Sequence, residues 1–400
     1  MIKTFKFKLY NSKSNKILLR QVFIANRIYN HFLALNMRYY KIYKKHLFSY
    51  QACKHLTKLK RLEKFKWMRS LPSQSSQDVI ERIDRGYKKF FKGLKSGIKT
   101  CPPKFKPRSK YGSFTLKQCG YKLLEGNRIR IGNKIFKFFK SRDIEGKVKR
   151  LTIKRDQVGD WFLFIVCEVG ALVQKPNLET GKRAGFDFGL KTFLTDHNGE
   201  TEQSPLFLKQ SLKSLKNFGK RLSKKKKGSN NRGRAKVRLA RLHRRVKNQR
   251  RDFHFKLARK LISKYDLIFL EDLNLKGMRK FWGRKISDLG FYSFVVILEY
   301  QCLKYGAQLY KIDRWYPSSQ VCSSCLKVKK LKLELLERKW ECVCGAVHNR
   351  DHNAAKNILR EGASSLGLCG IKTELAPQPR IPKSSHFGDG SMSIRQEIFL

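Results

Sequence analysis

Hydrophobic and polar positions alternate at the beginning of the chain. Phe5, Phe7 and Leu9 fall on one side of residues 1–10, and mostly charged residues fall on the other. A period of two residues is typical of a β-strand with one buried face. We therefore expect a first strand here, at the edge of a sheet or barrel.

The period changes to that of helices from about residue 18 to residue 95. A first helix has one continuous apolar side, a second is expected through Leu56–Trp67, and a third follows Pro72. Pro102 and Pro103 end this block because proline does not continue a helix. The block is predicted to be all helical.

Short alternating strands return in residues 113–170, where Gly132-Asn133 and Gly159-Asp160 mark turns. Together with the first strand they could close one small β-barrel, into which the helical block would be inserted. Residues 170–181 have the composition of a linker.

A third region, which begins at Arg183, mixes strands and helices, so the fold class is multidomain α+β. The predicted elements are strands at about 184–189 and 191–196, helices over 207–264 broken at 228–231, a buried strand Leu267–Leu270, a helix at about 287–305, a strand at 308–313 and a short helix from near Asp351. Residues 371–400 show no periodicity and are predicted to be a disordered tail.

Charge narrows the function classes. The 400 residues carry 90 Lys and Arg against 30 Asp and Glu, a net charge of +60, while 41% of residues are hydrophobic. Such a chain can fold, but its charges repel one another unless a polyanion such as nucleic acid neutralises them. No apolar run approaches the length of a membrane span, so no membrane partner is expected.

The basic residues are concentrated between Lys220 and Arg251, where 16 of 32 residues are Lys or Arg and none is acidic. Like charges four residues apart destabilise a helix unless phosphates neutralise them. We therefore predict a helical hairpin that contacts a nucleic-acid backbone. The candidate contacts are Lys224, Lys225, Arg238, Arg241 and Arg245.

Three acids stand in apolar surroundings: Asp187 within a strand, Glu271 at the end of a strand, and Asp351 at the beginning of a helix. Each could instead be a turn, salt-bridge or capping residue. If the fold brings them together, their mutual repulsion calls for divalent cations. Mg²⁺ prefers such oxygen ligands, and two ions about 4 Å apart can promote phosphodiester hydrolysis.

Four of the ten cysteines form two close pairs, Cys322 with Cys325 and Cys342 with Cys344. Two such pairs on a short segment without a core of its own predict one structural Zn²⁺. The second pair has one intervening residue, so Cys344 is the least certain ligand and His348 an alternative. With no export signal recognisable, the cysteines indicate a reducing compartment.

These motifs, in this order, resemble the TnpB (OrfB) family of insertion-sequence proteins over about residues 1–360. The motifs that carry the resemblance are Gly185–Phe193, Leu270–Leu273, Pro317–Cys325 and His348–Ile358, with Tyr29–Leu33 and Tyr87–Phe91 in the helical block.

The resemblance implies an RNA-guided DNA endonuclease with an RNase H-like (RuvC) nuclease domain related to type V CRISPR effectors. Asp187, Glu271 and Asp351 would be its catalytic acids, holding two Mg²⁺ ions. The implied partners are a noncoding guide RNA and double-stranded target DNA, which is cut beside a short flanking motif. The protein would act as a monomer with its RNA, in the cytoplasm of a prokaryote near the nucleoid.

The resemblance also implies a division of the chain. The expected parts are a wedge barrel (1–17 and 110–180), a helical recognition lobe (18–109), a RuvC-like nuclease domain (181–317 and 347–370) and a zinc-binding insertion that contacts target nucleic acid (318–346). Gln77 is the candidate for reading the flanking motif, since an amide can bind a base edge. Arg350 is a further candidate contact to nucleic acid.

Two departures from the family pattern concern metal binding. The segment that usually reads His-Asp-Arg-Asp is His348-Asn349-Arg350-Asp351 here, which keeps the second acid, so metal binding is expected to survive. The shortened second cysteine pair affects the geometry of the zinc site rather than the chemistry of cleavage.

Three alternative functions remain open. A compact type V CRISPR effector would share the catalytic layout. A non-cleaving, RNA-guided repressor would be expected to lack an acid, and none is missing. A nonspecific nucleic-acid packaging protein would need neither the acids nor the cysteines.

Overall fold

The computed structural model describes residues 2–170, 181–329 and 337–368. The chain forms two compact units, and the boundary between them lies near residue 171. The predicted linker at 170–181 and the predicted tail at 371–400 lie almost wholly outside the described residues. The two units are described separately.

The strands of the first unit form two antiparallel sheets, where the sequence predicted one small barrel. An isolated bridge between Leu9 and Phe138 joins the first sheet to the second. The first sheet has the order β1-β7-β6-β2, with β1 (Ile2–Lys8), β2 (Ser113–Leu116), β6 (Lys147–Arg155) and β7 (Trp161–Glu168). The second has the order β3-β4-β5, with β3 (Tyr121–Leu124), β4 (Arg128–Ile131) and β5 (Lys134–Lys137).

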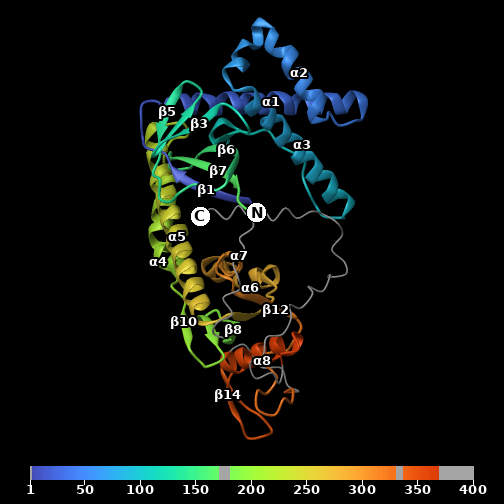
Figure 1. Cartoon of the computed structure of the whole chain (residues 1–400), viewed down its shortest axis with the longest axis vertical. Helices are drawn as coiled ribbons and strands as arrows, with labels where there is room; N and C mark the ends of the chain where they lie inside the picture. Colours follow the sequence, from blue (N-terminus) through green and yellow to red (C-terminus); the bar gives the residue numbers. More distant parts are fainter. Residues whose placement is uncertain (1, 171–180, 330–336, 369–400) are drawn as a thin grey trace. The chain divides into compact units, whose positions relative to one another are not determined.

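The helical block lies between β1 and β2 in the sequence and shares one hydrophobic core with the first sheet (Figure 1). Its elements are α1 (Asn15–Tyr43), α2 (Ser49–Arg61), the 3₁₀ helix η1 (Glu63–Ser70), α3 (Ser73–Lys95) and the short η2 (Arg108–Lys110). The expected second helix, Leu56–Trp67, was therefore wrong in its bounds. It begins at Ser49 and ends at Arg61, and a tighter helix follows.

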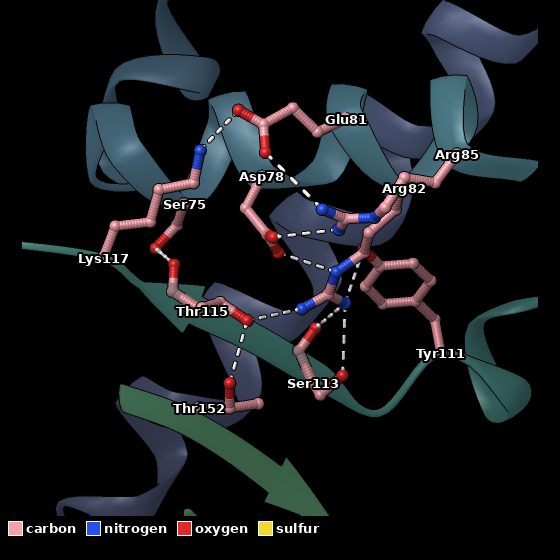
Figure 2. Close-up of polar contacts among 10 residues, drawn as sticks. All are labelled: Ser75, Asp78, Glu81, Arg82, Arg85, Tyr111, Ser113, Thr115, Lys117 and Thr152. Carbon is pink, nitrogen blue, oxygen red and sulfur yellow. Dashed lines mark hydrogen bonds and ion pairs between the residues drawn. The ribbon is translucent and has the colours of Figure 1, made fainter. Parts of the chain in front are cut away.

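A buried polar network fixes α3 to the first sheet (Figure 2). The Arg82 guanidinium pairs with Asp78 at 2.7 Å and donates to Thr115 Oγ1 at 2.8 Å and to the Ser113 carbonyl at 3.1 Å. Ser75 Oγ donates to the Thr115 carbonyl at 2.8 Å. Because these buried groups satisfy one another, the position of α3 on β2 is well determined.

The second unit is built on a five-stranded sheet in the order β10-β9-β8-β11-β12. Of its four pairs of neighbouring strands, β8–β11 and β11–β12 are parallel, and β10–β9 and β9–β8 are antiparallel. The strands are β8 (Arg183–Phe188), β9 (Thr192–Asp196), β10 (Thr201–Gln203), β11 (Leu267–Glu271) and β12 (Gln308–Ile312).

The predicted helical hairpin is present as α4 (Phe207–Ser223) and α5 (Asn230–Lys264), which lie side by side (Figure 1). Its turn is closed by Arg232, whose guanidinium donates to the carbonyls of Leu222 and Lys225 at 2.8 and 2.6 Å.

The prediction of one helix at about 287–305 was wrong in its first residues. Two helices occupy this stretch, α6 (Leu275–Leu289) and α7 (Phe291–Tyr305), and Gly290 separates them with φ of +66°. The last helix, α8 (Arg350–Ser365), begins where the sequence predicted it.

Within the three described ranges, no single helix is long and apolar enough to cross a membrane. Gly277–Leu289 and Phe291–Tyr305 meet that test of length and composition only as a pair, bent by 48°.

Candidate active site

Two of the three acids reach the same edge of the second unit's sheet. Asp187 lies in β8, and Glu271 is the last residue of β11. The strands are adjacent and parallel, and Phe186 pairs with Leu270. Asp187 and Glu271 each follow directly, so the strand register itself brings these carboxylates together.

The third acid is supplied by α8, which packs against β8 without a gap. A Cβ atom on Gly185 would lie 2.4 Å from the carbonyl oxygen of Ala355 and 2.4 Å from the backbone nitrogen of Leu359. Only glycine permits this approach. Asp351 stands in the first turn of the same helix. The close packing of β8 on α8 thus fixes Asp351 relative to Asp187.

All three acids line one cavity of about 900 Å³ in the second unit. Burial, reinforced by the charges of Glu271 and Asp351, raises the pKa of Asp187 well above its ordinary value. Burial also raises the pKa of Glu271, with a smaller contribution from Asp272. The structure therefore brings together the acids that the sequence singled out, in surroundings where their negative charges need a counter-charge.

Cations line the same cavity. Both carboxylate oxygens of Asp351 accept from Arg338 Nη1 at 3.1 Å. Arg350 faces the same space, and its positive charge lowers the pKa of Asp187, against the larger effect of burial. Sequence reasoning missed Arg338, because one more basic residue among 90 gives no signal.

A fourth acid in the cavity wall has a structural role. The carboxylate of Asp288 accepts hydrogen bonds from the backbone N–H groups of Leu208 and Lys209 at 2.8 and 3.0 Å. These are the first N–H groups of α4, which an acceptor must satisfy. Asp288 therefore holds the beginning of α4 beside the cavity.

Asn349, the position where the family pattern has its first acid, caps α8. Its side-chain oxygen accepts from the backbone N–H groups of Asp351 and His352 at 3.2 and 3.4 Å. Asparagine caps a helix about as well as aspartate does. The departure in this motif thus preserves the helix end that presents Asp351.

The four cysteines form a cluster that fits Zn²⁺. Their sulfur atoms all lie within 4.8 Å of one another, with Cys322 3.7 Å from Cys344 and Cys325 3.6 Å from Cys342. A tetrahedral site with Zn–S bonds of about 2.3 Å needs sulfur separations of about 3.8 Å. The single intervening residue in the second pair is therefore compatible with four thiolate ligands.

His348, the alternative ligand, lies beside this cluster. Its Nε2 is 3.0 Å from Cys322 Sγ, and its ring packs on Trp340 with 4.8 Å between ring centroids. The four sulfur atoms lie close enough together to fill a tetrahedral Zn²⁺ site, so His348 is not needed as a ligand. It is placed to donate a hydrogen bond to the Cys322 thiolate instead.

Two asparagines of α8 hold the first cysteine pair against the helix. Asn353 Nδ2 donates to the Val321 carbonyl at 2.7 Å, and Asn357 Nδ2 donates to Val321 and Ser318 at 2.6 and 2.8 Å. Asn353 Oδ1 accepts from the Ser323 N–H at 2.9 Å. The helix that carries Asp351 is thereby tied to the cysteine cluster.

The other candidate contacts to nucleic acid are not among the residues that line the acid cavity. Lys224 and Lys225 lie in the turn after α4, and Arg238, Arg241 and Arg245 lie on α5; all five are exposed and none lines the acid cavity. Gln77 is exposed on α3 of the first unit. Of the seven candidates, Arg350 alone lines the acid cavity.

Two family models match the chain between residues 164 and 358. The model OrfB_IS605, described as "Probable transposase", matches residues 164–281, and the Cas12f1-like TNB domain matches residues 291–358. The first match includes Asp187 and Glu271, and the second includes the four cysteines and Asp351.

Among curated relatives, a protein of Streptomyces pristinaespiralis named "Putative RNA-guided DNA endonuclease" is 36% identical over 249 residues, 62% of this chain. The chain spans only 59% of that relative's length. The Escherichia coli K12 protein named "Putative RNA-guided DNA endonuclease InsQ" is 28% identical over 390 residues, 92% of this chain and 94% of that protein.

Among solved structures, a Cas12f1–sgRNA–target DNA complex matches 90% of this chain and 98% of that chain, with a TM-score of 0.49 and 14% identity. The sequence matches confirm the resemblance to the TnpB/OrfB family: residues 164–281 match the OrfB_IS605 transposase model, residues 291–358 match the Cas12f1-like TNB domain, and the match to InsQ covers 92% of the chain.

Proposed function

We propose that this protein is an RNA-guided DNA endonuclease of an insertion sequence, which cuts DNA beside a short flanking motif. The observation that carries the proposal is the meeting of Asp187, Glu271 and Asp351 at one cavity, although they lie 80 or more residues apart in the sequence. The relatives named as RNA-guided DNA endonucleases support the same activity.

The three carboxylates are the catalytic acids of this proposal. They offer hard oxygen donors in a half-buried arrangement in which the charges of Glu271 and Asp351 act on Asp187, and such a donor set fits two Mg²⁺ ions. Bound Mg²⁺ would lower the pKa of water and stabilise the charge on the leaving oxygen. Arg350 and Arg338 add positive charge beside the acids, where a phosphodiester would bind.

The parts of the chain take the following roles in this proposal. The five-stranded sheet and its helices form the RuvC-like nuclease domain, and residues 318–346 form a zinc-binding insertion that contacts target DNA. In the first unit, the sheets act as the wedge and the helical block as the recognition lobe, where the exposed Gln77 reads the flanking motif. The exposed cations of α4 and α5 contact phosphates. The protein would act in the cytoplasm of a prokaryotic cell, near the nucleoid, where its net charge of +60 favours binding to nucleic acid.

The match to an insertion-sequence transposase model favours this reading over a CRISPR effector. The presence of all three acids favours it over a repressor that does not cut. Sequencing the RNA that copurifies with the protein tests whether a guide is bound. We expect this RNA to be transcribed from a transposon end and not from a repeat array.

Cleavage is tested with the Asp187→Ala variant. The variant should lose Mg²⁺-dependent cutting of a guide-matched DNA while it retains RNA binding. Asp252→Ala is the matched control, since Asp252 is an exposed aspartate of α5 that pairs with Lys256 and does not line the cavity. Cutting by Asp187→Ala at the wild-type rate would refute the proposal.

A further inference from the structure

The first unit contains a basic cavity whose residues are far in the sequence from Asp187, Glu271 and Asp351. It is a cavity of about 330 Å³, which we call the arginine cavity. Arginine and aromatic side chains dominate its wall, and no carboxylate is among the described residues that line it. The lining residues are Arg20, Phe23, Ile24, Asn26, Arg27, Trp67, Ser70 and Arg108.

Two of the arginines are stacked on rings of the same wall. The guanidinium carbon of Arg27 lies 4.0 Å from the Trp67 ring centroid, and that of Arg108 lies 3.2 Å from the Phe23 ring centroid. Stacking uses the flat face of a guanidinium and leaves the N–H groups at its edge available to an acceptor. A guanidinium stacked in this way is held in place and can still donate hydrogen bonds to a phosphate.

The wall that carries Arg108 is held in place by the amide side chains of two asparagines of α1. Asn26, which is 5% exposed, donates from Nδ2 to the Lys106 carbonyl at 2.9 Å. Asn30 donates to the same carbonyl at 2.9 Å and accepts from the Lys106 N–H at 3.0 Å. The segment that leads to Arg108 is thus fixed to α1 without a ligand.

The wall that carries Trp67 is fixed in the same way. Gln21 Nε2 of α1 donates to the Ser70 carbonyl at the end of η1 at 2.7 Å. Because both walls are attached to one helix, the cavity is formed in advance, and binding would require little ordering of the protein.

A neighbouring cavity of about 340 Å³ shares Phe23 and Arg108 with the arginine cavity. Arg155, Ser109, Tyr111 and Asp156 also line it. The Asp156 carboxylate is engaged within its own turn, where Oδ1 accepts from the backbone N–H groups of Val158, Gly159 and Asp160 at 3.0, 2.8 and 2.9 Å. Arg108 therefore lies between two cavities of similar volume, with its guanidinium against the Phe23 ring.

We propose that the two cavities bind two consecutive unpaired nucleotides of RNA, with Arg108 on the phosphate that joins them and one base against Trp67. Volumes of about 330 and 340 Å³ lie in the range of small-ligand pockets, so each cavity can take a group of about the size of one nucleotide. Unpaired RNA bases are commonly bound by aromatic rings and guanidinium planes. The choice of RNA rests on the proposed function, in which the guide supplies the unpaired strand.

The test uses the full-length protein freed of RNA and a fluorescent hexaribonucleotide, whose affinity is measured over a range of salt concentrations. Arg108→Ala should lower the slope of log affinity against log salt by about 0.7, the contribution of one single-strand phosphate. Arg38→Ala, which removes the same charge from an exposed site on α1 outside the cavity, should leave the slope unchanged.

Aromatic and arginine contributions can be separated. Trp67→Leu should weaken binding about tenfold with no change in slope, since stacking involves no phosphate. In a hexaribonucleotide carrying 4-thiouridine, photocrosslinks should map to peptides that contain Trp67 or Phe23, and Arg108→Ala should reduce them.

An unchanged slope for Arg108→Ala, or crosslinks confined to α4 and α5, would overturn the inference. A slope change seen with a 20-base-pair DNA duplex but not with RNA would also overturn it and would assign the cavity to duplex DNA. Because binding is measured without cleavage, a protein that passes this test but never cuts DNA would contradict the proposed function alone.

Discussion

Arg338 Nη1 lies 3.1 Å from each carboxylate oxygen of Asp351, so a side chain from the cysteine-rich segment pairs with an acid of the candidate nuclease site. The backbone supports this pair, because the Arg350 N–H donates to the Arg338 carbonyl at 2.8 Å. The same oxygens are those that a divalent ion would use.

The Arg338→Ala variant should therefore bind Mg²⁺ or Mn²⁺ more tightly than the wild type. Removing a competing, half-exposed cation should raise the affinity about fivefold, which corresponds to ~1 kcal/mol. Isothermal titration calorimetry measures the change. Lys339→Ala is the control, because the neighbouring lysine does not line the cavity. Weaker metal binding by Arg338→Ala would show that the arginine organises the acids instead of competing for them.

Zinc content should depend on the cysteine cluster. Cys322→Ser removes a buried sulfur ligand, and we expect the bound zinc, measured by mass spectrometry of the purified protein, to fall from one equivalent to near zero. Cys119→Ser changes an exposed thiol outside the cluster and should keep one equivalent. Full zinc content in Cys322→Ser would contradict the four-thiolate assignment.

Packing of α8 on β8 should be intolerant of a side chain at Gly185. Alanine there would place Cβ 2.4 Å from the backbone of α8, and overpacking of this kind costs roughly 3 kcal/mol in the free energy of unfolding. Denaturant unfolding measures the loss. Gly219→Ala is the matched control, since Gly219 lies within α4 and a Cβ there meets no atom within 4 Å; this variant should be as stable as the wild type or slightly more so.

A buried histidine should make the second unit sensitive to acid. Burial lowers the pKa of His254 to about 4, from an ordinary value of 6.5, and its Nε2 lies 3.0 Å from the Leu289 carbonyl oxygen. As pH falls from 6.5 to 4 the unfolded chain gains a proton that the folded chain does not, so the free energy of unfolding decreases, by at most about 3 kcal/mol.

His254→Gln should flatten this part of the pH profile, which is followed by thermal unfolding between pH 4 and pH 7. His243→Gln, at an exposed position of the same helix, is the control. An equally steep profile in His254→Gln would mean that other groups cause the acid sensitivity.

The sequence was informative where one residue contrasts with its neighbours. Asp187 and Glu271 are acids at the ends of apolar strands, and the parallel pairing of those strands then brings them together. The break between α4 and α5 was likewise visible as a run of Gly, Ser and Asn.

Features that depend on tertiary contacts were not predictable. The break at Gly290 is instead a local signal that sequence reasoning missed, since a glycine, which readily adopts a φ such as the +66° found here, commonly ends a helix. The separation of the first unit's strands into two sheets depends on which strands pair, which alternation alone does not specify. Arg338 acquires its significance only because the chain returns it to the first turn of α8.

The shortened cysteine pair does not alter the register of α8. Strands β13 (Lys339–Glu341) and β14 (Val347–Asn349) pair directly, with Trp340 opposite His348, and β14 leads into α8. The spacing of the second pair falls in the turn between the two strands, where Gly345 has φ of +80°. The spacing of the second cysteine pair is therefore set in the turn, while the angular position of Asp351 around the helix axis is set by the pairing of the two strands that lead into α8.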